Sequence, residues 1–193
     1  MIGDRLAFLR NFAVDPRSVG AVAPSSPALV AEMVGWFDWQ RHRRIVEYGP
    51  GTGVFTEAIV AERHPEAKFF AIELSADMVD RTRRRCPGVD VQHGSVTDVD
   101  RYCDARNVAS LDAVVCGLPW AAFDENLQDA ILTTMSLRLA SDARFATFAY
   151  LQGLALPAGR RFARKLHDRF GEVTTSRVVW RNLPPAIIYR CRP

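Results

Sequence analysis

Several residue types that mark special classes of protein are scarce in this sequence. Its 193 residues include only 4 cysteines, 12 glycines and 11 prolines, and 48% of them are hydrophobic. This composition excludes a collagen, a disulfide-stabilised miniprotein and a disordered tail. Because domains commonly contain about 100–200 residues, we expect one folded domain with a sizeable core and no second catalytic module.

Metal sites and membrane spans are not indicated either. The cysteines, Cys86, Cys103, Cys116 and Cys191, form no CxxC pair and have no histidine at a ligand spacing. Neither a metal site nor a disulfide framework is therefore expected. No run approaches the roughly 18 apolar residues of a membrane span, and charged residues among the first twenty positions exclude a signal peptide.

Lysine is nearly absent, and the charges are unevenly distributed. Residues 1–44 carry 6 basic and 4 acidic groups, residues 45–137 carry 8 and 15, and residues 138–193 carry 11 and 3. The basic C-terminal part indicates a surface for an anionic partner, either nucleic acid or anionic lipid headgroups. Arginine-rich codon usage explains the same composition equally well.

The order of the apolar segments indicates an α/β fold. Short runs rich in β-branched and aromatic residues alternate with helical patterns, as in a parallel sheet. Only Arg181 to Pro185 separates the last two strands, which are therefore expected to pair antiparallel. This ending predicts a Rossmann-like class I methyltransferase fold with a seven-stranded, mostly parallel sheet and an antiparallel C-terminal hairpin. The expected strands are 44–48, 68–73, 89–93, 113–116, 144–150, 173–180 and 186–191, and the expected helices are 1–13, 27–38, 53–63, 75–85, 124–139 and 158–169, with caps at Ser26, Ser75 and Asp124.

A glycine-rich turn follows the first strand, where residues 47–53 read EYGPGTG. Glycines permit a sharp turn and close approach of a ligand, and the helix that follows offers free N–H groups. The spacing is not the G-x-G-x-x-G of a pyrophosphate site. Glu47 would repel a phosphate, whereas it suits an ammonium group.

The next two strand ends complete a nucleoside site. Glu73 lies 22 positions after Gly51, where a carboxylate binds the hydroxyls of a ribose. Ser95 and the backbone N–H of Val96 are placed to contact adenine. An adenosine that carries an amino acid satisfies all three contacts, which predicts S-adenosylmethionine (AdoMet) as cofactor and S-adenosylhomocysteine as product. The expected cofactor residues are Glu47, Gly49, Gly51, Thr52, Gly53, Glu73, Leu74, Ser95, Val96, Gly117 and Leu118.

The fourth strand ends in Gly117-Leu118-Pro119-Trp120, towards which the sulfonium methyl is expected to point. Amino-group methyltransferases carry a polar residue at the first of these positions, whereas Gly117 offers only backbone carbonyls to orient the nucleophile. Trp120 is predicted either to present its ring to a cationic substrate or to anchor the loop.

Other segments are more specific than the glycine turn. They read FLR at 8–10, PRSVGAVAPSS at 16–26, GLP at 117–119, FAY at 148–150 and NLPPA at 182–186. With these segments, nearly the whole chain resembles the small bacterial phospholipid N-methyltransferases, which convert phosphatidylethanolamine to phosphatidylcholine with AdoMet.

This resemblance implies N-methylation of the phosphatidylethanolamine headgroup at a membrane surface by a methyltransferase domain at 16–193. Ser18 and the residues up to Ser26 would lie over the cofactor, and Tyr150 and Asn182 would line the headgroup site beside Trp120. Gly117 and Tyr150 are the expected catalytic positions, although water or the lipid phosphate is an equal candidate for the proton acceptor. Ser95 departs from the family, which often has an acidic residue there.

Three alternative functions stay open. One is methylation of another aminolipid, such as ornithine lipid. A second is RNA adenine N-methylation, suggested by a distant likeness to the ribosomal RNA adenine dimethyltransferases; Gly117 and the lack of an added RNA-binding domain make nucleic acid the less favoured partner. The third is a membrane-associated binding protein without turnover.

Residues 1–15 are expected to form an amphipathic helix, with Ile2, Leu6 and Leu9 along one side. Together with nearby arginines, such a helix can lie on an anionic membrane, although amphipathic helices more commonly pack onto their own domain. We expect a cytoplasmic protein associated peripherally with the inner face of the cell membrane.

Overall fold

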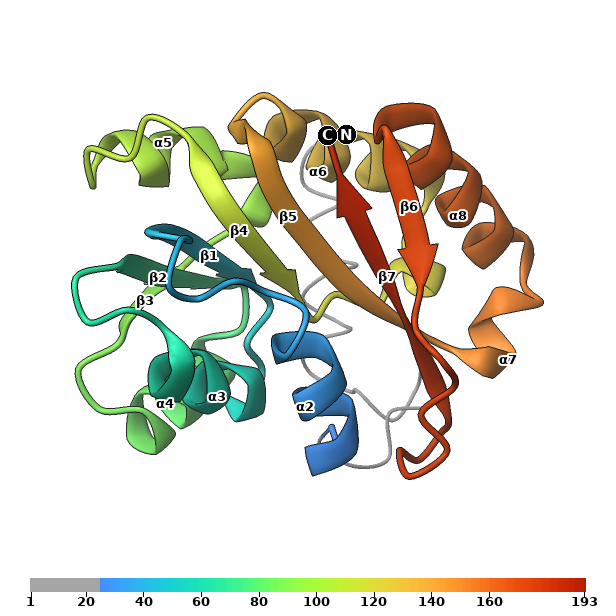
Figure 1. The fold of residues 1–193 in the computed structure, drawn as a ribbon, viewed down its shortest axis with the longest axis horizontal. Helices are drawn as coiled ribbons and strands as arrows, with labels where there is room; N and C mark the ends of the chain where they lie inside the picture. Colours follow the sequence, from blue (N-terminus) through green and yellow to red (C-terminus); the bar gives the residue numbers. More distant parts are fainter. Residues whose placement is uncertain (1–24) are drawn as a thin grey trace.

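The computed structural model describes residues 25–193, which form one sheet with helices on both faces (Figure 1). The strands are β1 (Arg44–Tyr48), β2 (Lys68–Glu73), β3 (Asp90–His93), β4 (Leu111–Cys116), β5 (Leu139–Tyr150), β6 (Glu172–Thr175) and β7 (Ala186–Arg192). Their order in the sheet is β3-β2-β1-β4-β5-β7-β6. Strands β1 to β5 run parallel, and β7 is antiparallel to both β5 and β6. The predicted fold and its antiparallel ending are confirmed.

The predicted helix caps are also confirmed. Ser26, Ser75 and Asp124 each accept a hydrogen bond from a backbone N–H in the first turn of the helix that follows. The helices are α2 (Pro27–Val34), α3 (Val54–Glu62), α4 (Ala76–Arg85), α5 (Val99–Asp104), α6 (Glu125–Ser136), α7 (Leu151–Leu154) and α8 (Pro157–Arg169), with short 3-10 turns η2 (Val96–Asp98) and η3 (Trp120–Ala122). The predicted helix at 1–15 and Ser18 lie outside the described residues. Among the described helices, none combines the length and apolar character needed to cross a bilayer.

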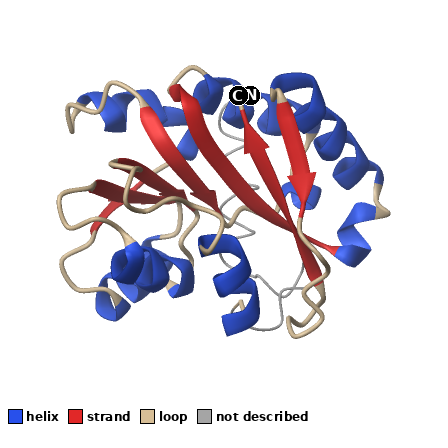
Figure 2. Cartoon of the chain, viewed as in Figure 1, coloured by secondary structure: helices blue, strands red, loops and turns tan. Residues whose placement is uncertain are grey.

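The hydrophobic core has one large cluster on each face of the sheet. The first lies against α5, α6 and α8 and includes Tyr48 and Phe162. The second lies against α2 and α3 and includes Leu29, Phe55 and Ile188. Figure 2 shows the red strands passing between these two groups of helices. The sheet is therefore covered on both faces, as parallel sheets require.

The edge strand β6 is shorter than the sequence predicts. The strand expected at 173–180 ends at Thr175, and beyond it only Val179 pairs, in an isolated bridge with Ala186. The hydroxyl of Ser176 accepts a hydrogen bond from the N–H of Ile188 at 3.0 Å. This side-chain contact replaces a ladder bond, and the chain continues as a loop into a turn at Trp180 and Arg181 instead of as a strand.

Other boundaries differ because packing and pairing act on them. Helix α2 stops before Gly35, whose N–H closes its last turn. Strand β5 begins at Leu139, which pairs with Leu111, so the predicted helix at 124–139 ends early. The short helices α5 and α7 were not predicted.

The parallel strands bring their carboxyl ends to one edge of the sheet. Tyr48 at the end of β1 is paired with Ile72 of β2 and with Cys116 of β4. The turns after β1, β2 and β4 therefore meet, and such an edge is where α/β sheets bind ligands.

Candidate active site

The turn after β1 has a backbone conformation that glycine adopts readily. Gly49, Gly51 and Gly53 have φ angles of 67°, 58° and 80°, in the left-handed region. A Cβ on Gly51 would meet no atom within 4 Å, so this position faces open space. Thr82 of α4 donates a hydrogen bond to the Gly51 carbonyl at 2.9 Å. The turn also contains the half-buried Thr52. Helix α4 thus supports the turn on one side, and the Cβ side of Gly51 is open.

Glu47 lies beside this turn and is only 1% exposed. Its Oε2 accepts a hydrogen bond from the Thr56 hydroxyl at 2.7 Å, whereas its buried Oε1 has no hydrogen-bond partner among the described residues. Burial raises the pKa of Glu47 to about 8, against the opposing effect of Thr56 and with a smaller contribution from Glu73. A buried carboxyl with a free oxygen is the group that a ligand ammonium would satisfy.

Glu73 connects the end of β2 to the glycine turn. Its Oε2 accepts from the N–H of Gly51 at 3.1 Å, and its Oε1 accepts from the N–H of Ser75 at 2.9 Å. Burial raises the pKa of Glu73, and these backbone hydrogen bonds act in the opposite direction. Because a carboxylate has about four acceptor positions, Glu73 keeps capacity for ribose hydroxyls. The adjacent Leu74 carbonyl is bonded to His93 Nε2 at 3.0 Å.

The turn after β3 holds the residues predicted for adenine. Ser95 caps η2, and its hydroxyl lies 2.7 Å from the Thr97 hydroxyl. Val96 is buried in the core. The structure thus places both residues beside the end of β2, and their contact with adenine stays a prediction.

The turn after β4 packs directly on the glycine turn. The N–H of Gly117 donates to the Tyr48 carbonyl at 2.8 Å. A Cβ on Gly117 would lie 2.6 Å from the Gly49 carbonyl oxygen, and a Cβ on Gly49 would lie 2.8 Å from Leu118 Cδ2. Gly117 and Leu118 therefore reach the cofactor turn as predicted, and close backbone packing is the reason for glycine at position 117.

These groups fit AdoMet. The free oxygen of Glu47 matches the amino group, the open face at Gly51 allows close approach, and Glu73 retains acceptor positions for a ribose.

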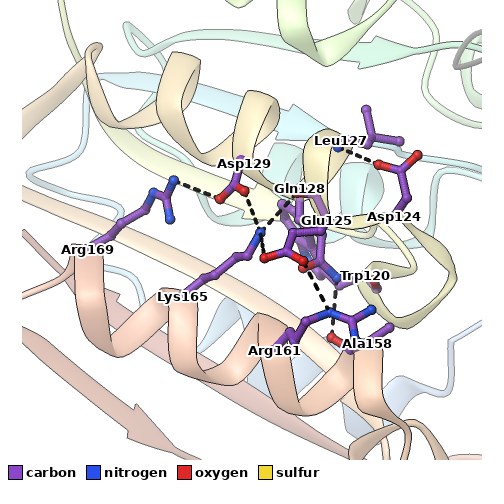
Figure 3. Close-up of polar contacts among 10 residues, drawn as sticks. All are labelled: Trp120, Asp124, Glu125, Leu127, Gln128, Asp129, Ala158, Arg161, Lys165 and Arg169. Atoms are coloured by element: carbon purple, nitrogen blue, oxygen red, sulfur yellow. Dashed lines mark hydrogen bonds and ion pairs between the residues drawn. The ribbon is translucent and has the colours of Figure 1, made fainter.

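Trp120 is a buried anchor of the loop after β4. It is 3% exposed, its indole N–H donates to the Thr147 hydroxyl at 2.8 Å, and its ring stacks on Phe162 at 4.3 Å. Gln128 donates to the Trp120 carbonyl at 2.8 Å (Figure 3). Because Phe162 stacks on the ring and the N–H is already used, Trp120 has the anchoring role that was one of the two alternatives, and its contact with the substrate stays a prediction.

Tyr150 lies at the carboxyl end of β5, on the same edge as Gly117. The side chain is half-buried, and its ring packs edge-to-face against Phe148 at 5.3 Å. Burial raises the pKa of the Tyr150 phenol.

Asn182 acts as a structural link between two distant segments. It is 3% exposed; its Oδ1 accepts from the N–H of Ser26 at 2.9 Å, and its Nδ2 donates to the Pro184 carbonyl at 2.7 Å. Both ends of the amide are used within the chain. Asn182 therefore positions the hairpin that borders the site, and its contact with the headgroup stays a prediction.

Replacing Asn182 by alanine should lower the free energy of unfolding by about 1–3 kcal/mol, because the Ser26 N–H and the Pro184 carbonyl lose their partner. Urea unfolding of the purified protein measures this. Asn126, exposed on α6, provides the matched control, since Asn126→Ala should change stability by less than about 0.5 kcal/mol. Equal stability of the two variants would show that the hydrogen bonds of Asn182 do not contribute to the free energy of unfolding.

Of the 11 basic residues in 138–193, six make ion pairs with described residues, and four of these six pair with the acidic middle of the chain. Lys165 and Arg169 of α8, for example, both pair with Asp129 of α6, at 2.6 and 2.9 Å (Figure 3). The basic residues of this segment that make no ion pair with another described residue are Arg144, Arg160, Arg164, Arg177 and Arg181.

Sequence reasoning missed the groups that hold the site together. Thr56 binds Glu47, Thr82 binds the Gly51 carbonyl, and Thr147 binds the Trp120 indole. One signal was available for Thr56, because it is a polar residue on the otherwise apolar face of α3 with Phe55 and Ile59.

Comparison with known proteins agrees with this site. The profile of a methyltransferase domain family matches residues 45–142, which span β1 to the start of β5. The glycine turn, the two carboxylates and this match define a class I AdoMet-dependent methyltransferase. The chain belongs to this family and, within it, to the group of the ornithine lipid N-methyltransferase of Singulisphaera acidiphila, with which it is 31% identical over 192 residues, 98% of this chain and 96% of the relative.

Solved structures share the fold. An O-methyltransferase from Bacillus cereus in complex with SAH has a TM-score of 0.67 at 13% identity, covering 98% of this chain and 91% of that one. The O-methyltransferase TomG from Streptomyces achromogenes, in complex with SAM, has a TM-score of 0.63 at 18% identity and covers 98% and 90% of the two chains. These structures show the fold, and membership of the methyltransferase family makes AdoMet the methyl donor of this enzyme.

Proposed function

We propose that this methyltransferase methylates the primary amine of an aminolipid headgroup, with ornithine lipid as the first substrate to test and phosphatidylethanolamine as the second. The observation that carries the proposal is the end-to-end similarity to the ornithine lipid N-methyltransferase of Singulisphaera acidiphila. Both headgroups combine an ammonium with an anionic group, a carboxylate or a phosphate. The motif segments shared with phospholipid N-methyltransferases are the reason to keep phosphatidylethanolamine in the test.

The edge between β4 and β5 supports a flexible alkyl amine as the nucleophile. Gly117 brings no side chain to this edge, and its tight packing on Gly49 excludes a larger residue. Tyr150 at the neighbouring strand end is the polar side chain that we assign to the amine.

AdoMet supplies an electrophilic methyl group on a good leaving group, so orientation of a neutral amine supplies much of the rate. The raised pKa of Tyr150 keeps its phenol protonated near neutral pH. We therefore assign Tyr150 the orientation of the amine through its phenol oxygen, and water or the anionic group of the lipid the removal of the proton.

Purified enzyme should transfer label from [methyl-³H]AdoMet to vesicles that contain ornithine lipid, and mass spectrometry of the product counts the methyl groups added. Parallel reactions contain phosphatidylethanolamine or total RNA in place of ornithine lipid. Label in phosphatidylethanolamine alone would make phosphatidylethanolamine the substrate in place of ornithine lipid. Label in RNA alone would overturn the lipid proposal. Asn126→Ala is the active control.

We also propose that the enzyme works on the cytoplasmic face of the cell membrane as a peripheral protein. Support comes from the lipid substrate proposed above and from the sequence pattern of residues 1–15. Cell fractionation tests this: the protein should sediment with membranes at low salt and leave them at high salt, because surface electrostatic attraction is screened.

A further inference from the structure

The loop between β6 and β7 exposes large apolar side chains. Trp180 is 71% exposed and Leu183 is 74% exposed. The other three tryptophans, Trp36, Trp39 and Trp120, are buried or half-buried, so the exposure of Trp180 is unusual within this chain. Exposure of two large apolar side chains to water is unfavourable, and it often marks a surface that binds a partner.

The loop is held in this form by hydrogen bonds. The N–H of Asn182 donates to the Val179 carbonyl at 3.2 Å, which closes a turn with Trp180 and Arg181 at its tip. Below the tip, the N–H of Val179 donates to the Ala186 carbonyl at 2.8 Å. The buried Asn182 amide ties the turn to the start of α2 through Ser26. The exposed side chains are therefore presented by a fixed turn.

The charge around the tip is positive. Residues 176–185 contain Arg177 and Arg181 and no acidic residue. Both arginines are exposed, and neither makes an ion pair with another described residue. The acids of the C-terminal part, Asp142, Asp168 and Glu172, lie at the start of β5, the end of α8 and the start of β6, at the other end of these strands.

The tip stands at the edge that carries the active site. Tyr150 is paired with Ala186 at the base of the hairpin, and the N–H of Leu151 donates to the Pro185 carbonyl at 2.9 Å. Figure 1 shows the β6–β7 loop extending beyond the carboxyl ends of β4 and β5. A surface that touched this tip would face the site of methyl transfer.

We propose that the β6–β7 tip, Trp180 with Arg181 and Leu183, docks into a bilayer that contains anionic phospholipid and thereby places Tyr150 at the headgroup level. Tryptophan favours the boundary between headgroups and acyl chains, leucine adds buried apolar area, and arginine pairs with anionic headgroups. This inference rests on the proposed aminolipid substrate and adds a membrane contact within the folded domain, separate from the segment at 1–15.

Tryptophan fluorescence tests the docking directly, because residues 1–24 contain no tryptophan. The full-length protein is mixed with phosphatidylglycerol–phosphatidylethanolamine vesicles whose acyl chains are brominated or plain. Brominated chains should quench the wild-type fluorescence, and Trp180→Phe should remove the quenching while the protein still sediments with the vesicles. Quenching that persists in Trp180→Phe, or bound wild-type protein without quenching, would overturn the proposal.

A second pair of variants tests the contribution of the tip to binding. Leu183→Glu should raise the vesicle concentration needed for half-maximal binding about tenfold, the equivalent of one buried leucine side chain. Leu137→Glu is the matched control, since Leu137 is 75% exposed just before β5, at the opposite edge of the sheet. Equal losses in the two variants would attribute the effect to charge alone and contradict docking by the tip.

Activity separates this inference from the proposed function. With lipid in vesicles, Leu183→Glu should raise KM for the lipid and leave kcat and AdoMet affinity unchanged, and with lipid dispersed in detergent it should match the wild type. Quenching by vesicles without methylation of any aminolipid would support docking and overturn the proposed function. Methylation of vesicle lipid without any effect of Leu183→Glu would overturn docking and support the function.

Discussion

Glu47→Gln is expected to weaken AdoMet binding about 100-fold, because it removes the buried carboxylate that we assign to the amino group of AdoMet. The buried Oε1 of Glu47 has no partner among the described residues, and an amide nitrogen or oxygen in its place carries no charge for an ammonium. Isothermal titration calorimetry of AdoMet measures the loss.

The pH dependence should identify the cause. Because the pKa of Glu47 in the folded protein is about 8, the carboxyl is mainly protonated at pH 6. An ammonium ligand favours the ionised form, so wild-type affinity should rise as the pH increases towards 8, and the affinity of Glu47→Gln should stay flat.

The free energy of unfolding of the ligand-free protein should fall as the pH rises, whereas the AdoMet affinity rises. The pKa of Glu47 is 4.5 in its ordinary state and about 8 when folded, so between these values the unfolded chain binds fewer protons. As the pH rises between these values, the free energy of unfolding of the ligand-free wild type should fall by up to about 1.4 kcal/mol per pH unit relative to that of Glu47→Gln. Below pH 4.5 the two proteins should show the same pH dependence.

Glu57→Gln, on helix α3 after the glycine turn, is the matched control. Glu57 is exposed and pairs with Arg85 at the surface, so its removal should leave AdoMet affinity within about twofold of the wild type. If Glu47→Gln bound AdoMet as tightly as this control, Glu47 would have no part in cofactor binding.

Gly117→Ala is expected to abolish methyl transfer, with at least about a 100-fold loss of kcat/KM for AdoMet. The added Cβ would lie 2.6 Å from the Gly49 carbonyl, a backbone atom in the cofactor turn. The two turns would have to separate, which should also cost about 1–3 kcal/mol of stability. Steady-state kinetics and urea unfolding measure the two effects.

Gly88→Ala separates the local clash from a general cost of losing a glycine. Gly88 has a φ of 84°, and its added Cβ would meet no atom within 4 Å. This variant should lose stability through backbone strain and keep its AdoMet affinity. An active Gly117→Ala enzyme would mean that the turns after β1 and β4 do not act as one rigid unit.

The sequence predicted the sheet because local and global signals agree there. The strands from β1 to β5 contain β-branched or aromatic residues, and Ser75 and Asp124 mark helix starts without any tertiary information. The end of β6 could not be predicted in this way. There the contact between Ser176 and Ile188 decides the structure, and the two residues are distant in sequence.

The same limit applies within the site. Glycine spacing and the positions of Glu47 and Glu73 correctly bring the predicted cofactor residues to one edge of the sheet, because the strand ends fix these positions. The structural contacts of Trp120 and Asn182 could not be predicted, because residue type shows what a side chain can do but not which partners it meets in the fold. Phe162 and Ser26, the neighbours that occupy them, come from α8 and from the start of α2.

Strand β7 follows β6 in the chain but lies between β5 and β6 in the sheet. A nascent chain that has produced only β6 therefore has two strands that cannot pair with each other and wait for the one between them. The hydrogen bond from Ser26 to Asn182, which spans 156 positions, likewise forms only after nearly all of the described chain has been made. Completion of the β5–β7–β6 side of the sheet is thus a late event in folding, and a truncated product would lack Tyr189 and its neighbours between β5 and β6.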